Sequence, residues 1–355
     1  MTARPVEVFP VGVHLLEELE AWGWSQAEFA EIIDRPAQVI SEIIAGKKEI
    51  TRESAAQIAA AMGQSPGYWL RLQDEYHLWR QGQDGAIQRQ LDDVRLRALL
   101  NQRAPLAVLR KRGIIAAATL REQAKQLCDL LEIDDLEQVP ELPMAARRSN
   151  TAEAVSPVQA TWLACVRRLA GTQSVNSYSS SALTSLAERL SRDVRDPAAF
   201  VDLPSRFADA GVRLVYVEAF PASKIDGASF EMDGTPVVGI SGRGHRLDKV
   251  LFTLLHEIAH IVLKHIDAGV ILDEGDPRGL RIEDEADRLA AEWILPGPLP
   301  RLPERPGQSW LYQTASMLGV HPIVIVGKLQ KAGSLSWRSA LAKDAPSVAK
   351  YLQDW

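Results

Sequence analysis

The sequence predicts an α+β protein that is predominantly helical, and the spacing of its apolar residues is the main reason. Apolar residues recur at helical spacing from residue 13 to about residue 77, and residues 81–200 read as mostly helical, whereas strand-like segments appear only after residue 201. The chain has 355 residues and 46% hydrophobic content, which is enough for two or three folded domains. We therefore expect a helical domain at residues 1–80, a helical connecting region at 81–200, and a C-terminal domain at 201–355 with a small antiparallel sheet.

The N-terminal domain is expected to contain five short helices separated by tight turns. Ser25-Gln26-Ala27-Glu28 has the spacing of a capping box and should begin the second helix. A third helix is expected from about Ala37 to Ile44, and Thr51 can cap a fourth helix that ends at Gly63. Pro66 is suited to the first turn of a fifth helix, because its missing N–H is not needed there.

Three strands are expected after residue 201. The segment from Val212 to Val217 reads as one strand, and residues 228–232 and 235–240 flank Asp233-Gly234, which is a signal for a two-residue hairpin turn. Pro236 cannot donate a hydrogen bond to a neighbouring strand, so its strand is expected at an edge of the sheet. An edge strand beside an active site can bind an extended peptide through main-chain hydrogen bonds.

A helix that is apolar on almost every side is expected from Asp248 to about Lys264, and such a helix is buried. Within it, His256 and His260 are four residues apart, about 40° around the helix axis, so both imidazoles can bind one metal ion. Glu257 lies about 100° further round, beside that metal, where it could take a proton from a water molecule. Burying these groups is costly unless a cation compensates them. A hydrogen-bonded core pair without metal is the alternative.

A third protein ligand should follow, because catalytic zinc usually has three. In the next acidic helix, Glu283 lies about 50° from the centre of the apolar face and Glu285 about 110° from it. We therefore expect Glu283 as the ligand, with Glu285 as its substitute and a solvated helix face as the alternative. Asp287, one turn later, could accept a hydrogen bond from a ligand imidazole and fix its tautomer. Zn²⁺ suits two histidines and a carboxylate, although Mn²⁺ or Fe²⁺ could bind there. His245 and His265 flank the histidine-bearing helix; we expect both to be solvent-exposed, with hydrogen bonding to a tetrahedral intermediate as the alternative.

These motifs together resemble the ImmA/IrrE family of metallopeptidases. The resemblance rests on the His-Glu-Ile-Ala-His helix preceded by Leu251-Phe252-Thr253, and on the following helix with Glu283-x-x-x-Asp287-x-x-Ala290 that ends at Leu295-Pro296. It covers residues from about Pro204 to Pro296. The resemblance implies a zincin-like, gluzincin-type endopeptidase fold and a repressor or similar regulatory protein as the substrate.

The N-terminal region resembles HigA-type antitoxins of the Xre helix-turn-helix class over residues 11–77. The matching segments are Trp24-Ser25-Gln26, Ile40-Ser41-Glu42-Ile43-Ile44, Gly46-Lys47-Lys48, Ile50-Thr51 and Tyr68-Trp69-Leu70-Arg71-Leu72-Gln73. The resemblance implies that the third helix enters the major groove of an operator, and that a homodimer reads two half-sites. Base contacts would then fall to Gln38 and Ser41, and phosphate contacts to Gln26, Lys47 and Lys48. It also makes a cognate toxin a possible partner.

The charge distribution weakens the expectation of DNA binding. Residues 1–75 contain six Lys/Arg and twelve Asp/Glu; since the whole chain contains 40 and 46, the remainder is balanced at 34 of each. Affinity for phosphate comes mainly from Lys and Arg, and Glu42 and Glu49 lie near the proposed DNA-binding surface. A protein-interaction module of the same fold is therefore the alternative for this domain.

The sequence also indicates the setting of the protein. It has no run of about 18 apolar residues and no N-terminal secretion signal, so we expect a cytoplasmic protein without a membrane partner. Cys128 and Cys165 are the only cysteines and are far apart in the sequence, which argues against a disulfide framework or a cysteine-based metal site.

Two hypotheses from different classes follow. The first is a cytoplasmic transcriptional regulator that carries a zinc endopeptidase, with Glu257 as the general base. The second is a DNA-binding antitoxin or repressor whose metal domain senses a ligand, or binds a partner, without proteolysis. The presence of Glu257 favours the enzyme, because a site that only binds metal does not need it. In a third arrangement the helix-turn-helix recruits a protein substrate and does not contact DNA.

Overall fold

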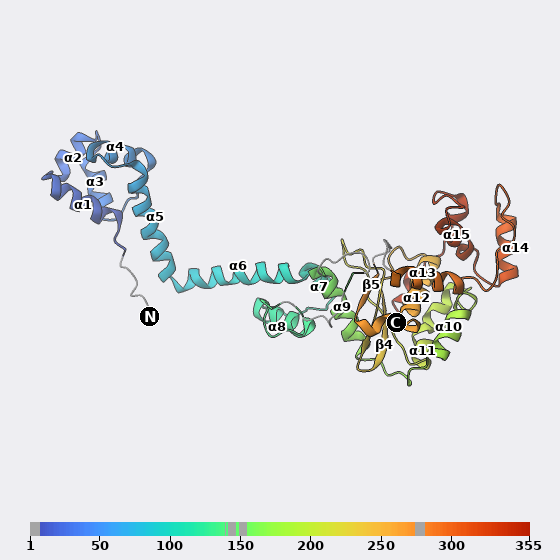
Figure 1. Cartoon of the computed structure of the whole chain (residues 1–355). Helices are drawn as coiled ribbons and strands as arrows, with labels where there is room; N and C mark the ends of the chain where they lie inside the picture. The colour runs from blue at the N-terminus through green and yellow to red at the C-terminus, as the bar shows by residue number, and fades with distance from the viewer. Residues whose placement is uncertain (1–7, 139, 141–146, 149–154, 274–280) are drawn as a thin grey trace. The chain divides into compact units, whose positions relative to one another are not determined.

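The computed structural model describes residues 8–138, 140, 147–148, 155–273 and 281–355 (Figure 1). The chain divides into two compact units, Met1–Leu96 and Arg97–Trp355. The predominantly helical α+β class predicted from the sequence is confirmed. Among the described residues, no helix is both long enough and apolar enough to cross a membrane.

The first unit contains the five predicted helices in a row. They are α1 (Val11–Trp22), α2 (Gln26–Ile32), α3 (Ala37–Ile44), α4 (Arg52–Met62) and α5 (Pro66–Gln83), and α6 (Gly85–Arg103) continues from this unit into the next. Capping boxes at Ser25 and Thr51 begin α2 and α4, because each side chain accepts a hydrogen bond from the backbone three residues later. Gly63, in the left-handed conformation, ends α4 as predicted.

The core of the first unit is formed by one apolar face from each helix. Its fully buried side chains include Leu15, Phe29, Ile40, Ile58 and Trp69. Helices α1 and α3 approach closely at Gly12, where a Cβ atom would lie 2.4 Å from the carbonyl oxygen of Ile43. Only glycine permits this crossing, so the position of α3 is fixed by backbone contact as well as by side-chain packing.

The second unit contains the remaining helices and a single sheet. Its α-helices are α7 (Leu106–Lys111), α8 (Leu120–Leu131), α9 (Pro157–Ala170), α10 (Ser180–Asp193), α11 (Leu203–Asp209), α12 (Leu247–Val262), α13 (Arg281–Trp293), α14 (Gln308–Leu318), α15 (Pro322–Lys331) and α16 (Ala349–Leu352). Its 3₁₀ helices are η1 (Pro197–Asp202), η2 (His265–Ala268) and η3 (Ala340–Ala342).

The sheet is mixed, which corrects the expectation of a wholly antiparallel sheet. Its strands are β1 (Arg147–Arg148), β2 (Arg213–Tyr216), β3 (Gly227–Met232), β4 (Thr235–Ile240) and β5 (Ile271–Asp273), in the order β1-β5-β3-β4-β2. The predicted hairpin of β3 and β4 is antiparallel, and β5 joins β3 in the same sense. The two outer strands instead run parallel to their neighbours, β1 along β5 and β2 along β4.

The position of β4 overturns the expectation drawn from Pro236. This strand lies between β3 and β2, and so is not an edge. Pro236 is tolerated because β2 begins to pair only at Val237, one residue later, so no hydrogen bond from Pro236 is required on that side. The edges are formed by β1 and β2 instead, and the peptide-docking role suggested for β4 is not supported.

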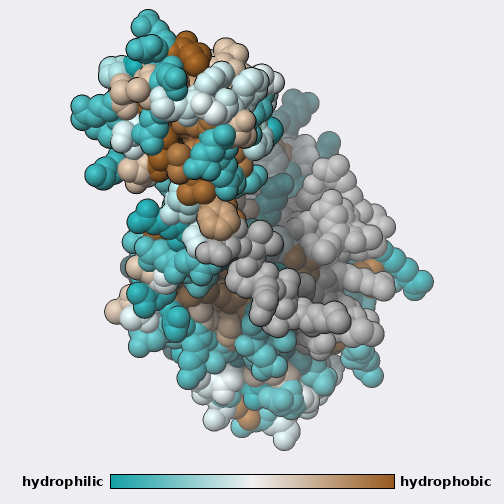
Figure 2. All heavy atoms as spheres, turned by 90° about the vertical axis from the view of Figure 1, so that its left-hand side faces the viewer, coloured by the Kyte–Doolittle hydropathy of each residue, from teal (hydrophilic) through white to brown (hydrophobic). Residues whose placement is uncertain are grey.

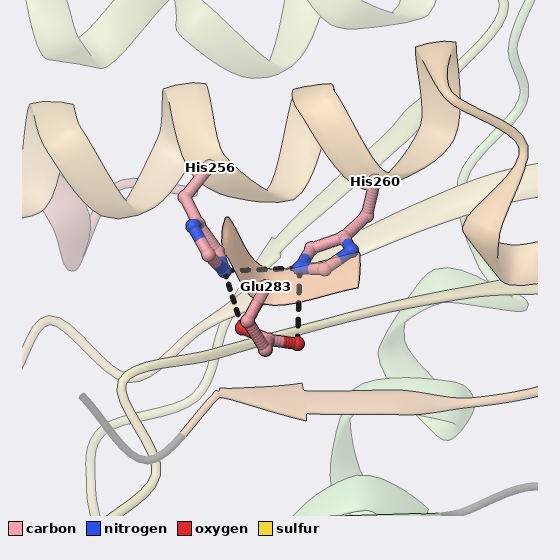
Figure 3. Close-up of side chains that lie close together, drawn as sticks. All are labelled: His256, His260 and Glu283. Carbon is pink, nitrogen blue, oxygen red and sulfur yellow. Dashed lines mark hydrogen bonds and ion pairs between the residues drawn. The ribbon is translucent and has the colours of Figure 1, made fainter. Parts of the chain in front are cut away.

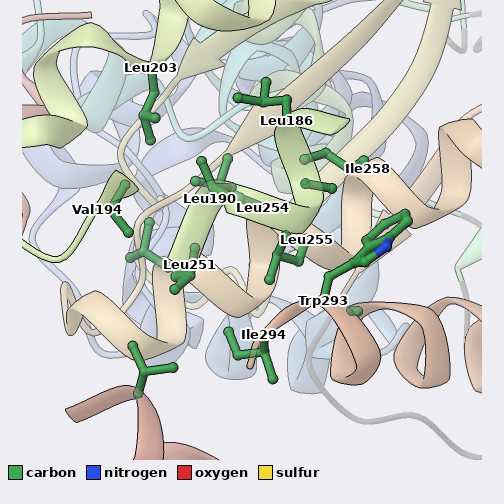
Figure 4. Packing of buried hydrophobic residues seen from close by; sticks show 14 of the residues in the cluster. Leu186, Leu190, Val194, Leu203, Leu251, Leu254, Leu255, Ile258, Trp293 and Ile294 are labelled. Atoms are coloured by element: carbon green, nitrogen blue, oxygen red, sulfur yellow. The ribbon is translucent and has the colours of Figure 1, made fainter. Parts of the chain in front are cut away.

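Helix α12 occupies the centre of the second unit. It packs against β3 and β4 of the sheet and against α10, α13 and α15. Leu251, Leu254, Leu255 and Ile258 are fully buried, and Figure 4 shows them among Leu190 on one side and Trp293 and Ile294 on the other. The apolar residues therefore hold α12 firmly, and the polar groups on this helix are fixed along with it.

Candidate metal centre

The structure brings together His256 and His260 from α12 and Glu283 from the first turn of α13 (Figure 3). Their ligand atoms all lie within 4.8 Å of one another. The Nε2 atoms of the two histidines are 2.9 Å apart. One carboxylate oxygen of Glu283 is 3.2 Å from His256 Nε2, and the other is 3.5 Å from His260 Nε2.

The three groups are buried and fit a divalent cation. His256 is 3% exposed, His260 is 0% exposed and Glu283 is 2% exposed. Glu283 Oε1 has no hydrogen-bond donor, although it is buried. Two imidazole Nε2 atoms facing each other can share only one proton, so the cluster cannot satisfy all its atoms with hydrogen bonds alone. A cation bound to the three atoms would satisfy them together.

The carboxylate of Glu283 is strongly acidic. Burial opposes its ionised form, but the neighbouring imidazoles of His256 and His260 outweigh burial and lower the pKa of Glu283 to about 2. Burial also lowers the pKa of His260, against the opposing effect of Glu283. At neutral pH the pair therefore offers an anionic oxygen and a neutral imidazole, which are the forms that bind metal.

Glu257 follows His256 on α12 and is 0% exposed. Neither carboxylate oxygen has a hydrogen-bond partner. The backbone of Gly227 on β3 passes so close that a Cβ atom there would lie 2.4 Å from Glu257 Oε1. Burial raises the pKa of Glu257 well above its ordinary value, and the negative charge of Asp273 adds to the increase while His256 opposes it. An unpaired buried acid is costly to stability, which is typical of a functional site.

Asp287 lies where the sequence placed it, one turn after Glu283. Its Oδ1 atom is 3.0 Å from Nδ1 of His256. Its Oδ2 atom is 3.4 Å from Nζ of Lys331 on α15. Burial opposes the charge of Asp287, but the bonds to His256 and Lys331 lower its pKa. Asp287 can thus hold the His256 proton on Nδ1 and leave Nε2 free for a metal.

His265 was missed by the sequence analysis, which expected it to be exposed. Its side chain is 9% exposed, and its Nδ1 atom is 3.0 Å from Nδ1 of His260. Lys264 adopts a left-handed φ of 60° and reverses the chain after α12, which returns His265 to the site. The spacing of five residues after His260 could have drawn attention to it, but the reversal is not visible in the sequence. His245 remains half-buried, with no partner at Nδ1.

Glu285, the substitute considered for Glu283, does not join the three ligand atoms. Its side chain is 34% exposed, and its Oε2 atom is 3.3 Å from Nε2 of His265. Its other oxygen accepts a hydrogen bond of 2.8 Å from Arg281. The angular positions expected for Glu283 and Glu285 on α13 therefore agree with their burial: Glu283 faces inward and Glu285 is partly exposed.

A cavity of about 660 Å³ opens beside the cluster. His256 and Glu283 line it, whereas Glu257 and His260 do not. The other lining residues are charged and apolar side chains from several elements, namely Asp226, Arg243, Arg246, Asp248, Lys249, Phe252, Thr253, Asp273, Asp287, Ala291, Ile294, Val324, Gly327, Lys328, Lys331, Ala332 and Trp337. A cavity of this size can admit several side chains of a peptide.

In the first unit, the candidate DNA-contacting residues lie on or near the surface. Gln38 and Ser41 are exposed and three residues apart on α3, so they share a face. Lys47 and Lys48 are exposed in the turn after α3, whereas Gln26 is half-buried at the start of α2.

Acidic and apolar groups interrupt this surface. Gln38 Nε2 donates a hydrogen bond of 2.9 Å to Glu42, and the Nζ atom of Lys48 is 4.0 Å from the same carboxylate. Figure 2 shows apolar side chains, in brown, exposed among the polar ones of this unit. Trp22 is 52% exposed and Ile32 is 50% exposed. The surface therefore contains features that suit a protein partner as well as DNA.

Comparison with known proteins supports both parts of this description. Residues 15–69 match the family model described as Helix-turn-helix, and residues 208–329 match the one described as IrrE N-terminal-like domain. A helix-turn-helix-type transcriptional regulator of Haemophilus influenzae is 31% identical over 96 residues, which are 27% of this chain and 87% of the relative. A second, from Escherichia coli, is 30% identical over 86 residues, which are 24% of this chain and 85% of the relative.

A solved structure is also similar to part of this chain. It is that of an addiction module antidote protein of a HigA family from Coxiella burnetii, which is 28% identical and has a TM-score of 0.21. The match covers 21% of this chain and 84% of that chain.

The fold and the matches define a helix-turn-helix protein that also carries an IrrE-like domain. The chain belongs to the helix-turn-helix family of transcriptional regulators, and its second unit contains the IrrE N-terminal-like domain. The two family resemblances inferred from the sequence, to the ImmA/IrrE metallopeptidases and to Xre-type helix-turn-helix proteins, are thereby confirmed.

Proposed function

We propose that this transcriptional regulator carries a zinc-dependent endopeptidase that cleaves a repressor or other regulatory protein. The observation that supports the proposal best is the buried cluster of His256, His260 and Glu283, whose ligand atoms lie within 4.8 Å of one another. The match to the IrrE N-terminal-like domain covers all three residues. Zn²⁺ suits two imidazoles and a carboxylate, and Mn²⁺ and Fe²⁺ are the alternatives.

His256, His260 and Glu283 would hold the metal, each through one atom. When bound, the cation supplies Lewis-acid polarisation of the scissile carbonyl and of the attacking water. The peptide enters by way of the cavity, because His256 and Glu283 are the members of the cluster that line it. Phe252 and Trp337 in the same lining give apolar surface for substrate side chains.

Glu257 is the group in this chain that moves the proton. It accepts the proton of the attacking water on its carboxylate and then donates it to the nitrogen of the leaving amine. Its carboxylate has no hydrogen-bond partner in the protein, so it is available for this role. Asp287 holds the proton of His256 on Nδ1, 3.0 Å away, and so keeps Nε2 directed at the cluster.

The first unit would connect this activity to transcription. We propose that it binds an operator as a homodimer, with Gln38 and Ser41 near base edges and with Gln26, Lys47 and Lys48 near phosphates. The helix-turn-helix match and the exposure of both α3 side chains support this role. The protein substrate would be a repressor or an antitoxin, and a cognate toxin is a further possible partner. We propose that the protein acts in the cytoplasm.

The burial of Glu257 favours a second candidate function. Glu257 is 0% exposed and is not among the residues that line the cavity, so the structure does not place its carboxylate on the cavity surface. A metal domain that senses a ligand, or binds a partner, without proteolysis needs only the three ligand atoms. In that case the chain is a DNA-binding repressor or antitoxin whose metal site has a regulatory role.

The test measures metal content and proteolysis in the same preparations. Wild type, Glu257→Gln, His260→Ala and Glu283→Ala are purified without chelator, and zinc is measured by elemental analysis. Each is then incubated with helix-turn-helix repressors of the same organism, and cleavage is followed by mass spectrometry. We expect stoichiometric zinc in wild type and Glu257→Gln, loss of zinc in the two ligand variants, and cleavage by wild type alone.

Each other result has a definite meaning. Zinc in wild type without cleavage of any repressor, and without any effect of Glu257→Gln on repressor binding, favours the sensing function. Absence of metal from wild type, together with no uptake on titration with zinc, contradicts both the endopeptidase and the sensing function. Retention of full cleavage by Glu257→Gln would remove Glu257 from the mechanism and leave the metal site intact.

A further inference from the structure

A second line of contacts runs from His260 away from the cluster. Nδ1 of His260 is 3.0 Å from Nδ1 of His265, and Nε2 of His265 is 3.3 Å from Oε2 of Glu285. The other oxygen of Glu285 accepts a hydrogen bond of 2.8 Å from Nε of Arg281. The chain of contacts therefore passes from a fully buried imidazole to an exposed guanidinium in three steps.

Metal binding at His260 would allow one arrangement of protons along this line. A ligand imidazole binds metal through a lone pair, so with Nε2 of His260 on the metal its proton must be on Nδ1. That N–H donates to Nδ1 of His265, which must then be the unprotonated nitrogen of its ring. The proton of His265 is consequently on Nε2, where it donates to the carboxylate of Glu285.

We propose that His265 and Glu285 are positioning residues that fix the tautomer and the ring orientation of His260 for metal binding. The proposal rests on the metal site described above and extends it to two residues that have no ligand atom in the cluster. Glu285 orients His265, His265 orients His260, and Arg281 holds Glu285 in place. Glu285 therefore supports the ligand His260 indirectly, through His265, and does not replace Glu283 as a ligand.

The two ligand histidines are then supported in different ways. His256 contacts a carboxylate directly, because Asp287 Oδ1 is 3.0 Å from its Nδ1 atom. His260 contacts a neutral imidazole, and the carboxylate lies behind it. A carboxylate partner makes an imidazole more electron-donating than a neutral partner does. The direct carboxylate should therefore affect the metal more strongly than the relayed one.

The chain is built to bring His265 into this position. α12 ends at Val262, and Lys264 adopts a left-handed φ of 60°, which turns the chain back toward the site. The His265 ring is 9% exposed, and its centroid lies 5.2 Å from that of His260. Both of its nitrogens have a partner, as a buried imidazole requires if it is not to lose hydrogen bonds on folding.

The test compares variants that keep or remove the acceptor for the His260 proton. Zinc affinity is measured in the full chain by competition with a chromogenic chelator, which requires no activity. We expect His265→Leu to weaken zinc binding by roughly 10- to 100-fold, in the range found for the loss of such outer partners. His265→Asn should recover most of this loss, because its Oδ1 atom can take the place of Nδ1 as the acceptor.

Glu285 and an outside histidine provide the matched comparisons. Glu285→Ala should weaken zinc binding by less than His265→Leu, and Glu285→Gln by less again, because the Gln oxygen still accepts from His265. His77→Leu alters an exposed histidine of the first unit and should leave zinc affinity unchanged. Circular dichroism of each variant checks that the helices remain folded.

The tautomers give a second readout on the wild-type protein. With ¹⁵N-labelled histidine and bound zinc, we expect a proton on Nδ1 of His260 and on Nε2 of His265. A proton on Nδ1 of His265 would overturn the proposal, as would zinc affinity of His265→Leu within twofold of wild type. Failure of the wild type to bind zinc would instead contradict the metal site itself, so the two failures can be told apart.

Discussion

The candidate metal site of the second unit and the exposed face of α3 in the first differ in how strongly the fold constrains them. His256, His260 and Glu283 are buried, and each has at least one polar neighbour within 3.5 Å. Gln38 and Ser41 are exposed, and Gln38 donates a hydrogen bond to Glu42 on its own helix. Buried polar groups need hydrogen-bond partners within the protein, whereas exposed polar groups can form hydrogen bonds with water. The fold therefore fixes the polar neighbours of His256, His260 and Glu283, whereas Gln38 and Ser41 can exchange water for a binding partner.

The largest expected effect is that of metal removal, which should separate the two regions. A metal that binds only the folded second unit stabilises it by about 4 kcal/mol at a thousandfold excess over its dissociation constant. The first unit has no ligand in the cluster, so its unfolding should not change. Differential scanning calorimetry of the full chain with zinc and with EDTA measures this. A shift of every transition, or of none, would contradict the assignment of the metal to the second unit.

The next effect concerns the free-energy cost of burying the Glu257 carboxyl group. Its buried carboxyl has no hydrogen-bond partner, so replacing it with an apolar side chain should stabilise the metal-free protein. We expect Glu257→Leu to raise the free energy of unfolding of the second unit by about 1–3 kcal/mol while abolishing proteolysis. Urea unfolding in EDTA measures it. A loss of stability would indicate that Glu257 has a structural role near Gly227.

A change at Gly12 tests the close contact between α1 and α3. A Cβ atom at Gly12 would lie 2.4 Å from the carbonyl oxygen of Ile43, so Gly12→Ala should force α1 and α3 apart. We expect the free energy of unfolding of the first unit to fall by about 1–3 kcal/mol, as at other overpacked sites. Gly67→Ala in the first turn of α5 is the control, because a Cβ there meets no atom within 4 Å. Urea unfolding followed by tryptophan fluorescence distinguishes them, and equal effects would contradict the close crossing.

The smallest effect concerns the exposed lysines. If Lys47 and Lys48 contact phosphates, Lys47→Ala and Lys48→Ala should each weaken binding to an operator fragment and reduce the salt slope of binding by about 1. Lys111→Ala, in the second unit, is the control. Fluorescence anisotropy at several salt concentrations measures the slopes. Operator binding with no change in either lysine variant would exclude these lysines from the phosphate contacts, and no salt-dependent binding at all would favour a protein-interaction role for the first unit.

Much of the local structure could be predicted because its causes are local. The capping boxes at Ser25 and Thr51, the helix from Ala37 to Ile44 and the Asp233-Gly234 hairpin all depend on residues a few positions apart. Two histidines four residues apart on a helix share a face in any fold, so this part of the cluster required no knowledge of the tertiary structure. The choice of Glu283 over Glu285 followed from the apolar face of α13 in the same way.

The failures arise where distant segments meet. Pro236 correctly indicated a missing hydrogen bond, but it could not show that β2 begins to pair one residue later and leaves room for a proline in an inner strand. His265 lies beyond the end of α12, and only the reversal at Lys264 returns it to His260. Neither event has a signature in the spacing of apolar residues, because each depends on where another segment ends or turns.

The sequence by itself therefore determined the helices, the hairpin, both family resemblances and the pair of imidazoles with an adjacent carboxylate. The tertiary structure alone decided the mixed order of the sheet, the approach of Glu283 and Asp287 to α12, and the enclosure of Glu257 beneath Gly227. The physical reason is the range of the interactions. Periodicity and caps act within one element, whereas the distances and burial that give a metal site its chemistry are set by packing between elements.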